Sequence, residues 1–117
     1  MNVYEAKQIF DKDSETKGYI PDEENDLVFV IDGYCFIVQT FDGFNNVIVS
    51  KYKKSKSTLK DVFYKFREKL IENKIDVIRI EGRGNRYGIL KKMFPNNSFM
   101  FEVTDNGRYV YYGKVNC

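Results

Sequence analysis

The sequence contains no histidine and no tryptophan, and it has only two cysteines and two prolines among its 117 residues. Without histidine, zinc sites of the His/Cys kind lack their ligands, and catalysis by a histidine base in a Ser-His-Asp or Cys-His arrangement is excluded. We therefore expect no metal site. Any chemistry must use carboxylates, tyrosine, lysine, backbone amides or groups that the substrate brings.

The two cysteines, Cys35 and Cys117, lie far apart in the sequence and do not form a disulfide framework. We expect both to be free thiols in a reducing compartment. The sequence also lacks an apolar run long enough to cross a bilayer, and its start, MNVYEAKQIF, shows no apolar signal core behind a basic end. These absences predict a cytoplasmic protein without a membrane partner.

The length fits a single domain, but charge divides the chain into an acidic lead and a basic body. Residues 1–26 carry three lysines and eight acids, a balance of −5, which leaves +7 for residues 27–117 because the whole chain carries +2. We interpret 1–26 as an acidic helix and loop, and 27–117 as the main α/β domain. The net positive charge of residues 27–117 attracts partners with phosphate groups, either nucleic acid or a nucleotide cofactor.

Hydrophobic periodicity predicts the first half of the fold. Apolar residues at helical spacing near the start predict a short helix, and residues 14–26 are typical of a loop. The apolar runs 27–31 and 34–41 are separated by Asp32-Gly33, which is a strong hairpin signal because glycine adopts positive φ at little cost. A second Asp-Gly pair at 42–43 precedes a third strand, so we expect an antiparallel meander.

The second half predicts a parallel step and a closing hairpin. Apolar positions in a single stripe (Leu59, Val62, Phe63, Phe66, Leu70) indicate a helix that Ser57 or Thr58 caps and that stops near Asn73. A strand at 75–80, a Gly-rich turn at 81–86, a short helix at 87–94 and a terminal hairpin follow. After the N-terminal helix the order is β-β-β-α-β-α-β-β, which predicts a mixed, mostly antiparallel α/β sheet.

This order, the string IRIEGRGNRYGILKKMF and the tail GRYVYYGKV resemble the GNAT superfamily of N-acetyltransferases over about residues 27–114. The resemblance implies that acetyl-coenzyme A binds where the third and fourth strands part, and that its acetyl group passes to an amine of a small molecule or protein. It implies a coenzyme site at Val49 and Lys51 (backbone groups), Ser55, Lys56, Ser57 and Thr58 (pyrophosphate) and Asn85 (the start of the next helix). It also implies Glu81 as the base and Tyr87 as the proton donor.

The sequence departs from the family where the pyrophosphate loop is expected, because the segment KYKKSK (51–56) has lysines in place of both glycines. One alternative is therefore a non-catalytic version of the same sheet, serving as a binding or structural module of a phage, another virus or a mobile element. For the two catalytic candidates, the structural alternative is that Glu81 pairs with Arg79 or Arg83 on the surface and that Tyr87 packs a helix end.

Another alternative is a nucleic-acid-binding protein, because the segment Lys51–Lys74 holds nine positive residues against three acids, a local balance of +6. Tyr52 and Tyr64 would then stack on bases. The glycines at 82, 84 and 88 do not match the dinucleotide-binding fingerprint, since their spacing is one residue too long.

Overall fold

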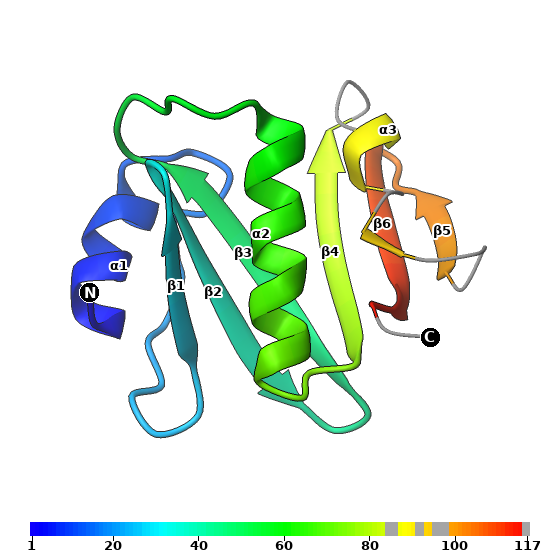
Figure 1. Cartoon of the computed structure of the whole chain (residues 1–117), viewed down its shortest axis with the longest axis horizontal. Coiled ribbons are helices and arrows are strands. Elements are labelled where there is room, and N and C mark those ends of the chain that lie inside the picture. Colours follow the sequence, from blue (N-terminus) through cyan, green and yellow to red (C-terminus); the bar gives the residue numbers. More distant parts are fainter. Residues whose placement is uncertain (84–86, 91–92, 95–98, 116–117) are drawn as a thin grey trace.

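The computed structural model describes residues 1–83, 87–90, 93–94 and 99–115 and shows a mixed α+β fold (Figure 1). The order of elements is the predicted one. They are α1 (Val3–Asp11), β1 (Leu27–Ile31), β2 (Tyr34–Phe41), β3 (Phe44–Lys51), α2 (Leu59–Glu72), β4 (Val77–Arg83), α3 (Tyr87–Leu90), β5 (Phe99–Val103) and β6 (Arg108–Lys114).

The six strands form one sheet in the order β1-β2-β3-β4-β6-β5. Every neighbouring pair is antiparallel except β3 and β4, which are parallel because α2 carries the chain from one to the other. This confirms the predicted mixed, mostly antiparallel sheet with one parallel step.

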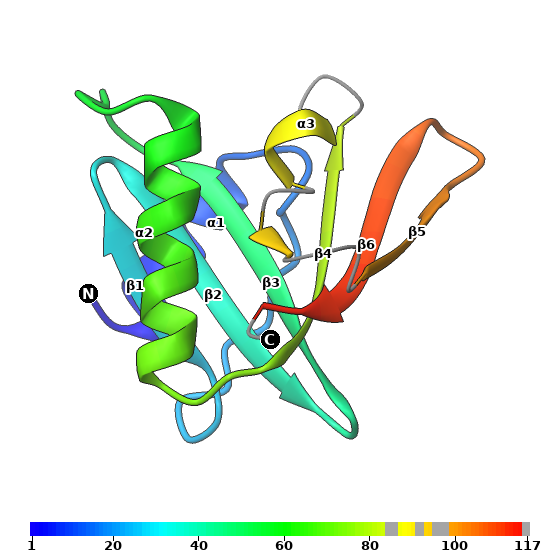
Figure 2. The same cartoon turned by 45° about the vertical axis from the view of Figure 1, so that its right-hand side comes forward.

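Helices cover both faces of the sheet, with α1 on one face and α2 and α3 on the other (Figures 1 and 2). Strand β2 therefore buries residues of both its faces: Phe36 packs toward α2, whereas Cys35 and Ile37 pack toward α1. The core on the α2 face consists of Ile31, Phe36, Val38, Val47, Val62, Phe63, Phe66, Leu70, Ile75, Ile78, Ile80, Leu90, Met93, Phe94, Tyr111 and Val115.

Both longer helices begin at a side-chain cap. The Asn2 side chain accepts hydrogen bonds from the backbone N–H groups of Tyr4 and Glu5, and the Glu5 carboxylate accepts one from the Asn2 N–H, which completes a capping box. The Thr58 hydroxyl accepts a hydrogen bond from the Asp61 N–H at 3.2 Å. This confirms the predicted start of α2, whose buried residues are those of the predicted stripe except Leu59, which is half-buried.

The first hairpin turn brings two distant segments together. Asp32 and Gly33 both adopt positive φ, 42° and 88°, as a tight turn between twisted strands requires. Gly33 also lies directly beneath the segment after β3, so that a Cβ atom there would lie 2.5 Å from the Lys53 carbonyl oxygen. Glycine is required here both for its conformation and for its small size.

The prediction of a turn at 81–86 was wrong for its first three residues, and β4 lies two to three residues later than the predicted strand at 75–80. Glu81, Gly82 and Arg83 continue β4 because β6 pairs with them, from Glu81↔Val110 to Arg83↔Arg108. A Cβ atom at position 82 would overlap the side chain of Leu90 in α3. Gly82 therefore permits close packing rather than a turn.

The acidic segment before β1 is a loop, as predicted, but it is anchored to the sheet. Tyr19 is buried with Phe10 of α1, the two rings meeting edge to face at 5.4 Å, and its hydroxyl donates a hydrogen bond to Asp26. Cys35 is a buried free thiol, whereas Cys117 lies outside the described residues. Within the described part of the chain, no helix is long and apolar enough to span a membrane.

Candidate functional site

The two parallel strands part along their length. The register of β3 and β4 runs from Asn45↔Ile78 to Val47↔Ile80 and stops there, although β3 continues to Lys51 and β4 to Arg83. Beyond this point the strands diverge toward the end of the sheet where α2 begins (Figure 1). The predicted opening between the third and fourth strands is therefore present.

Backbone groups of β3 face this opening. The Tyr52 N–H donates to the Gly33 carbonyl at 2.9 Å, so Tyr52 directs its backbone groups toward β2. Ser50, two residues earlier and paired with Cys35, does the same. Because successive residues of a strand direct their N–H and C=O groups to opposite edges, Val49 and Lys51 direct theirs away from β2 and toward β4. These are the two residues predicted to offer backbone groups to the coenzyme.

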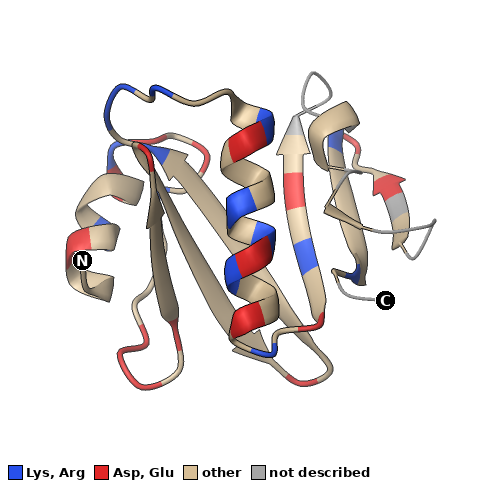
Figure 3. Cartoon of the chain, in the orientation of Figure 1, with Lys and Arg blue, Asp and Glu red and all other residues tan. Residues whose placement is uncertain are grey.

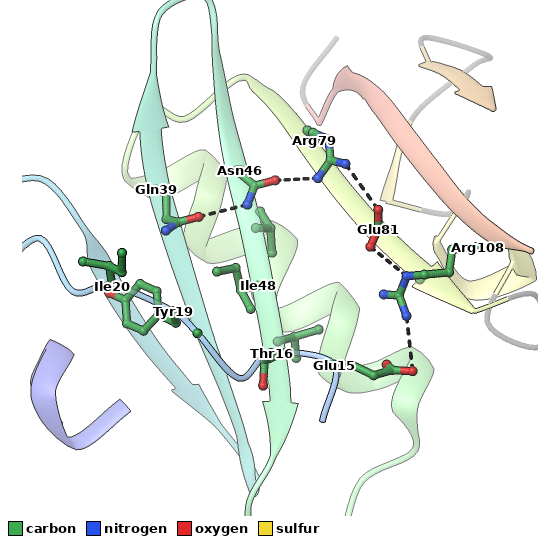
Figure 4. Close-up of a pocket in the computed structure, with 14 residues that line it drawn as sticks. Glu15, Thr16, Tyr19, Ile20, Gln39, Asn46, Ile48, Arg79, Glu81 and Arg108 are labelled. Carbon is green, nitrogen blue, oxygen red and sulfur yellow. Dashed lines mark hydrogen bonds and ion pairs between the residues drawn. The ribbon is translucent and has the colours of Figure 1, made fainter. Parts of the chain in front are cut away.

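A polar pocket of about 400 Å³ lies beside the opening on the face that carries α1 (Figure 4). The loop after α1 forms one wall, and β2, β3, β4 and β6 form the floor and the other wall. Its lining residues are Glu15, Thr16, Gly18, Tyr19, Ile20, Gln39, Asn46, Val47, Ile48, Val49, Arg79, Glu81, Gly82 and Arg108.

A continuous chain of hydrogen bonds crosses the floor of the pocket (Figure 4). Asn46 of β3 donates a hydrogen bond to the side-chain carbonyl of Gln39 on β2 at 2.9 Å. It accepts a hydrogen bond from Arg79 of β4, also at 2.9 Å. Arg79 in turn contacts one oxygen of Glu81 at 3.3 Å. With Arg108 of β6, which donates to the other Glu81 oxygen, the chain joins four strands because all these side chains project from the same face of the sheet.

Glu81, the predicted base, lies at the centre of this chain. Its second oxygen accepts a hydrogen bond of 2.7 Å from Arg108, which also pairs with Glu15 of the loop at 3.2 Å. The Glu81 side chain remains 33% exposed and lines the pocket. Glu81 pairs with Arg79, as one alternative interpretation of the sequence predicted. Its second partner is Arg108 on β6, and all three residues line the pocket.

The partners of Arg108 determine the pKa of its guanidinium group. Burial lowers the pKa of its guanidinium, but hydrogen bonding to Glu81 and the charges of Glu81 and Glu15 outweigh that effect and raise the pKa above its ordinary value. Arg108 therefore stays cationic and holds Glu81 and the loop together.

The predicted pyrophosphate site has an occupant from within the chain. One carboxylate oxygen of Asp32 accepts hydrogen bonds from the Lys56 N–H at 3.0 Å, the Ser57 N–H at 2.6 Å and the Ser55 hydroxyl at 3.0 Å. Backbone N–H groups before a helix are where an anionic ligand would bind. Here the carboxylate of the first hairpin turn already binds them.

These hydrogen bonds set the titration of Asp32. They hold its pKa well below the ordinary value of 3.8, with Ser57 contributing most, ahead of the Lys56 N–H. The contact is therefore at full strength above the unfolded-state pKa and is lost as the pH falls through the lower folded-state pKa.

We predict that Asp32→Asn lowers the melting temperature at neutral pH and that the difference from wild type shrinks below about pH 4. Asparagine is chosen because it tolerates the positive φ of this turn. Thermal melts between about pH 7 and about pH 2.5 measure the effect. Asp42→Asn, at the second Asp-Gly turn, is the matched control, and an equal response of both variants would contradict the prediction.

The structure brings some of the predicted residues together and leaves others apart. Val49 and Glu81 line the same pocket, whereas Lys51 lines a different one and the predicted pyrophosphate residues (Ser55, Lys56, Ser57, Thr58) line neither. Asn85 and the side chain of Tyr87 lie outside the described residues, although the backbone of Tyr87 begins α3.

Comparisons of the chain with models of protein families, with curated proteins and with solved structures give no match. What the chain does must therefore be argued from the site itself.

Sequence reasoning missed several residues of the site. The pairing of Glu81 with Arg79 was predicted as one alternative, since residues two apart on one strand direct their side chains to the same face. No such signal exists for Asp32, which lies 24 residues from Lys56, or for Arg108, which lies 27 residues from Glu81. Only the folded sheet brings those partners together.

Proposed function

We propose that this chain is a divergent GNAT-like N-acetyltransferase domain, which moves an acetyl group from acetyl-coenzyme A to an amine. The observation that carries the proposal is the parting of β3 and β4 after Val47↔Ile80, with backbone groups of Val49 and Lys51 directed into the gap. Among the described residues the pairing of β3 with β4 ends at Val47↔Ile80, and a strand edge beyond its pairing suits the amide-rich arm of coenzyme A, which pairs with backbone as a strand does.

The described residues fit the two ends of the coenzyme differently. The thioester end fits, because the opening leads to a pocket that holds a carboxylate. The pyrophosphate end fits only after Asp32 releases the N–H groups of Lys56 and Ser57. Coenzyme binding therefore requires that the pyrophosphate replace the Asp32 carboxylate at the N–H groups of the loop before α2.

Acetyl-coenzyme A supplies an activated acyl group held as a thioester. In the proposed reaction, Glu81 accepts the proton that the amine nitrogen loses as its new bond to the acetyl carbon replaces the carbon–sulfur bond. Arg79 and Arg108 hold the two Glu81 oxygens in position. The sulfur leaves as a thiolate, for which Tyr87 stays the predicted proton donor.

The test is the effect of acetyl-coenzyme A on the melting temperature. A ligand at 100 times its dissociation constant stabilises the folded state by about 2.7 kcal/mol, so millimolar coenzyme should produce a clear upward shift. Lys56→Glu should abolish the shift by repelling the phosphates. Asp32→Gly should enlarge it, because glycine keeps the positive φ and frees the N–H groups of Lys56 and Ser57.

The control ligand is acetyl pantetheine, which has the thioester and lacks the nucleotide. It should bind wild type and Lys56→Glu equally, because it does not reach the loop. If neither the wild type nor Asp32→Gly responds to acetyl-coenzyme A, the transferase proposal is wrong.

A specific observation favours a second candidate, a non-catalytic binding module with the same sheet. The N–H groups of Lys56 and Ser57 and both oxygens of Glu81 already have partners within the chain. If these contacts are permanent, the pocket serves recognition and not chemistry. In that case Asp32→Gly lowers stability without creating any coenzyme binding.

A further inference from the structure

We propose that the lysine-rich end of the molecule is a binding surface for single-stranded nucleic acid. This surface, called here the lysine surface, is separate from the polar pocket and does not depend on the transferase proposal. It consists of Lys51, Lys53, Lys54, Lys56 and Lys60 with the rings of Tyr34, Tyr52 and Tyr64.

The lysines of this surface are exposed and carry uncompensated charge. Among the described residues, none of the five forms an ion pair, whereas Lys7 and Lys69 elsewhere on the surface do. Three carboxylates lie nearby: Asp32 accepts hydrogen bonds from the loop, Asp61 complements the first turn of α2, and Asp13 accepts a hydrogen bond from the Ser50 hydroxyl. The positive charge is therefore available to a phosphate backbone.

Aromatic rings alternate with these lysines. The ammonium groups of Lys51, Lys53 and Lys60 lie 5.7, 5.6 and 5.8 Å from the ring centres of Tyr34, Tyr52 and Tyr64, respectively. Tyr64 is 41% exposed although it belongs to a helix with a complete buried stripe, so its ring is not needed by the core. Tyr34 and Tyr52 are half-buried against the two cores, so Tyr64 is the exposed ring of the three. An exposed ring among cations stacks on unpaired bases, which a duplex does not offer.

A cavity of about 520 Å³ opens within the same surface and suits one nucleotide. Lys12 and Lys51 flank it, Tyr52 forms one wall, and Ser50 lies in it with its hydroxyl bonded to the Asp13 carboxylate at 3.0 Å. Lysine among the lining residues suits a phosphate, and the Tyr52 ring suits a base, while the Lys51 ammonium group lies over the Tyr34 ring. A run of positive charge beside a cavity that accepts one nucleotide is typical of a single-strand binding groove.

One separation of charge among the described residues favours approach at this end. The lysine surface lies at the end of the sheet where α2 begins, and the acidic residues of the loop 22–26 lie at the opposite end (Figure 3). Such a separation orients a polyanion before contact and raises the rate of association. The contact between Asp32 and the loop 55–57 also holds the backbone of Lys56 in one arrangement.

Fluorescence anisotropy with labelled oligonucleotides of about 20 nucleotides, uridine or thymidine only, tests the proposal without coenzyme present. If five lysines each neutralise one phosphate, the slope of log affinity against log salt is about −3.5, and affinity falls about 100-fold between about 50 and 200 mM salt. In Lys53→Glu/Lys54→Glu the slope should fall to about −2.

The matched control is Lys17→Glu/Lys69→Glu, which makes the same change in net charge at exposed positions outside the lysine surface. It should keep the wild-type slope. Tyr64→Leu should lose about tenfold in affinity through lost stacking, whereas Tyr64→Phe should keep wild-type affinity.

Three results would overturn the proposal. One is the absence of binding at about 100 µM protein and about 50 mM salt. Another is an equal loss in the two charge-reversed double variants, which would trace binding to net charge alone. The third is an unchanged affinity of Tyr64→Leu with equal binding of duplex, which would exclude recognition of unpaired bases.

Discussion

Glu81→Gln should lower the rate of acetyl transfer at least about 100-fold, because an amide cannot accept the proton of the attacking amine. Glutamine has the shape of glutamate, so the floor of the pocket should be preserved. The measurement is release of the coenzyme thiol from acetyl-coenzyme A in the presence of primary amines and peptides with free amino ends.

The control for this variant is Glu72→Gln, at the exposed end of α2, where the carboxylate pairs with Lys69 at 3.6 Å. It should retain the wild-type rate. Circular dichroism and melting temperature should confirm that Glu81→Gln is folded. If the folded Glu81→Gln protein keeps more than about half of the wild-type rate, Glu81 is not the base.

Phe66→Ala should destabilise the protein by about 4 kcal/mol, a large part of the free energy of unfolding of a domain of this size. Phe66 is fully buried and stacks on Phe36, with ring centres 4.0 Å apart, and Phe29 meets its edge at 6.0 Å. Alanine would leave a cavity between α2 and the strands β1 and β2. Unfolding in urea measures the loss as a lower midpoint with an unchanged slope.

Tyr64→Ala is the control for Phe66→Ala, since it removes an aromatic ring from the same helix at a position that is 41% exposed. It should change the free energy of unfolding by less than about 1 kcal/mol. A loss below about 1 kcal/mol for Phe66→Ala would show that the core on the α2 face refills the cavity and that this residue does not anchor the helix.

The order of elements was predictable because the signals for it are local. The stripe of α2, the two Asp-Gly turns and the apolar runs of β1 and β2 each lie within a few residues of one another. The end of β4 was not predictable, because Glu81, Gly82 and Arg83 are in a strand only through pairing with β6. Glycine and charged residues favour a turn until a partner strand supplies hydrogen bonds.

The candidate site was predictable in part. Glu81 and Val49 were predicted and do line one pocket, and their roles stay predictions. The anion at the loop before α2 was expected to come from a ligand, but within the chain it comes from Asp32. That residue was interpreted only as half of a turn, because nothing near position 32 in the sequence indicates which segment its side chain contacts.

By itself, then, the sequence determined the order of the described helices and strands, the exclusion of histidine chemistry and the separation of negative and positive charge along the chain. Tertiary structure decided where β3 and β4 part, which guanidinium groups hold Glu81, and that Asp32 binds the N–H groups of Lys56 and Ser57. The physical reason is the distance along the chain over which each kind of interaction acts. Periodicity and turn preferences act between near neighbours in the chain, whereas these contacts join residues that only the closed sheet brings within hydrogen-bonding distance.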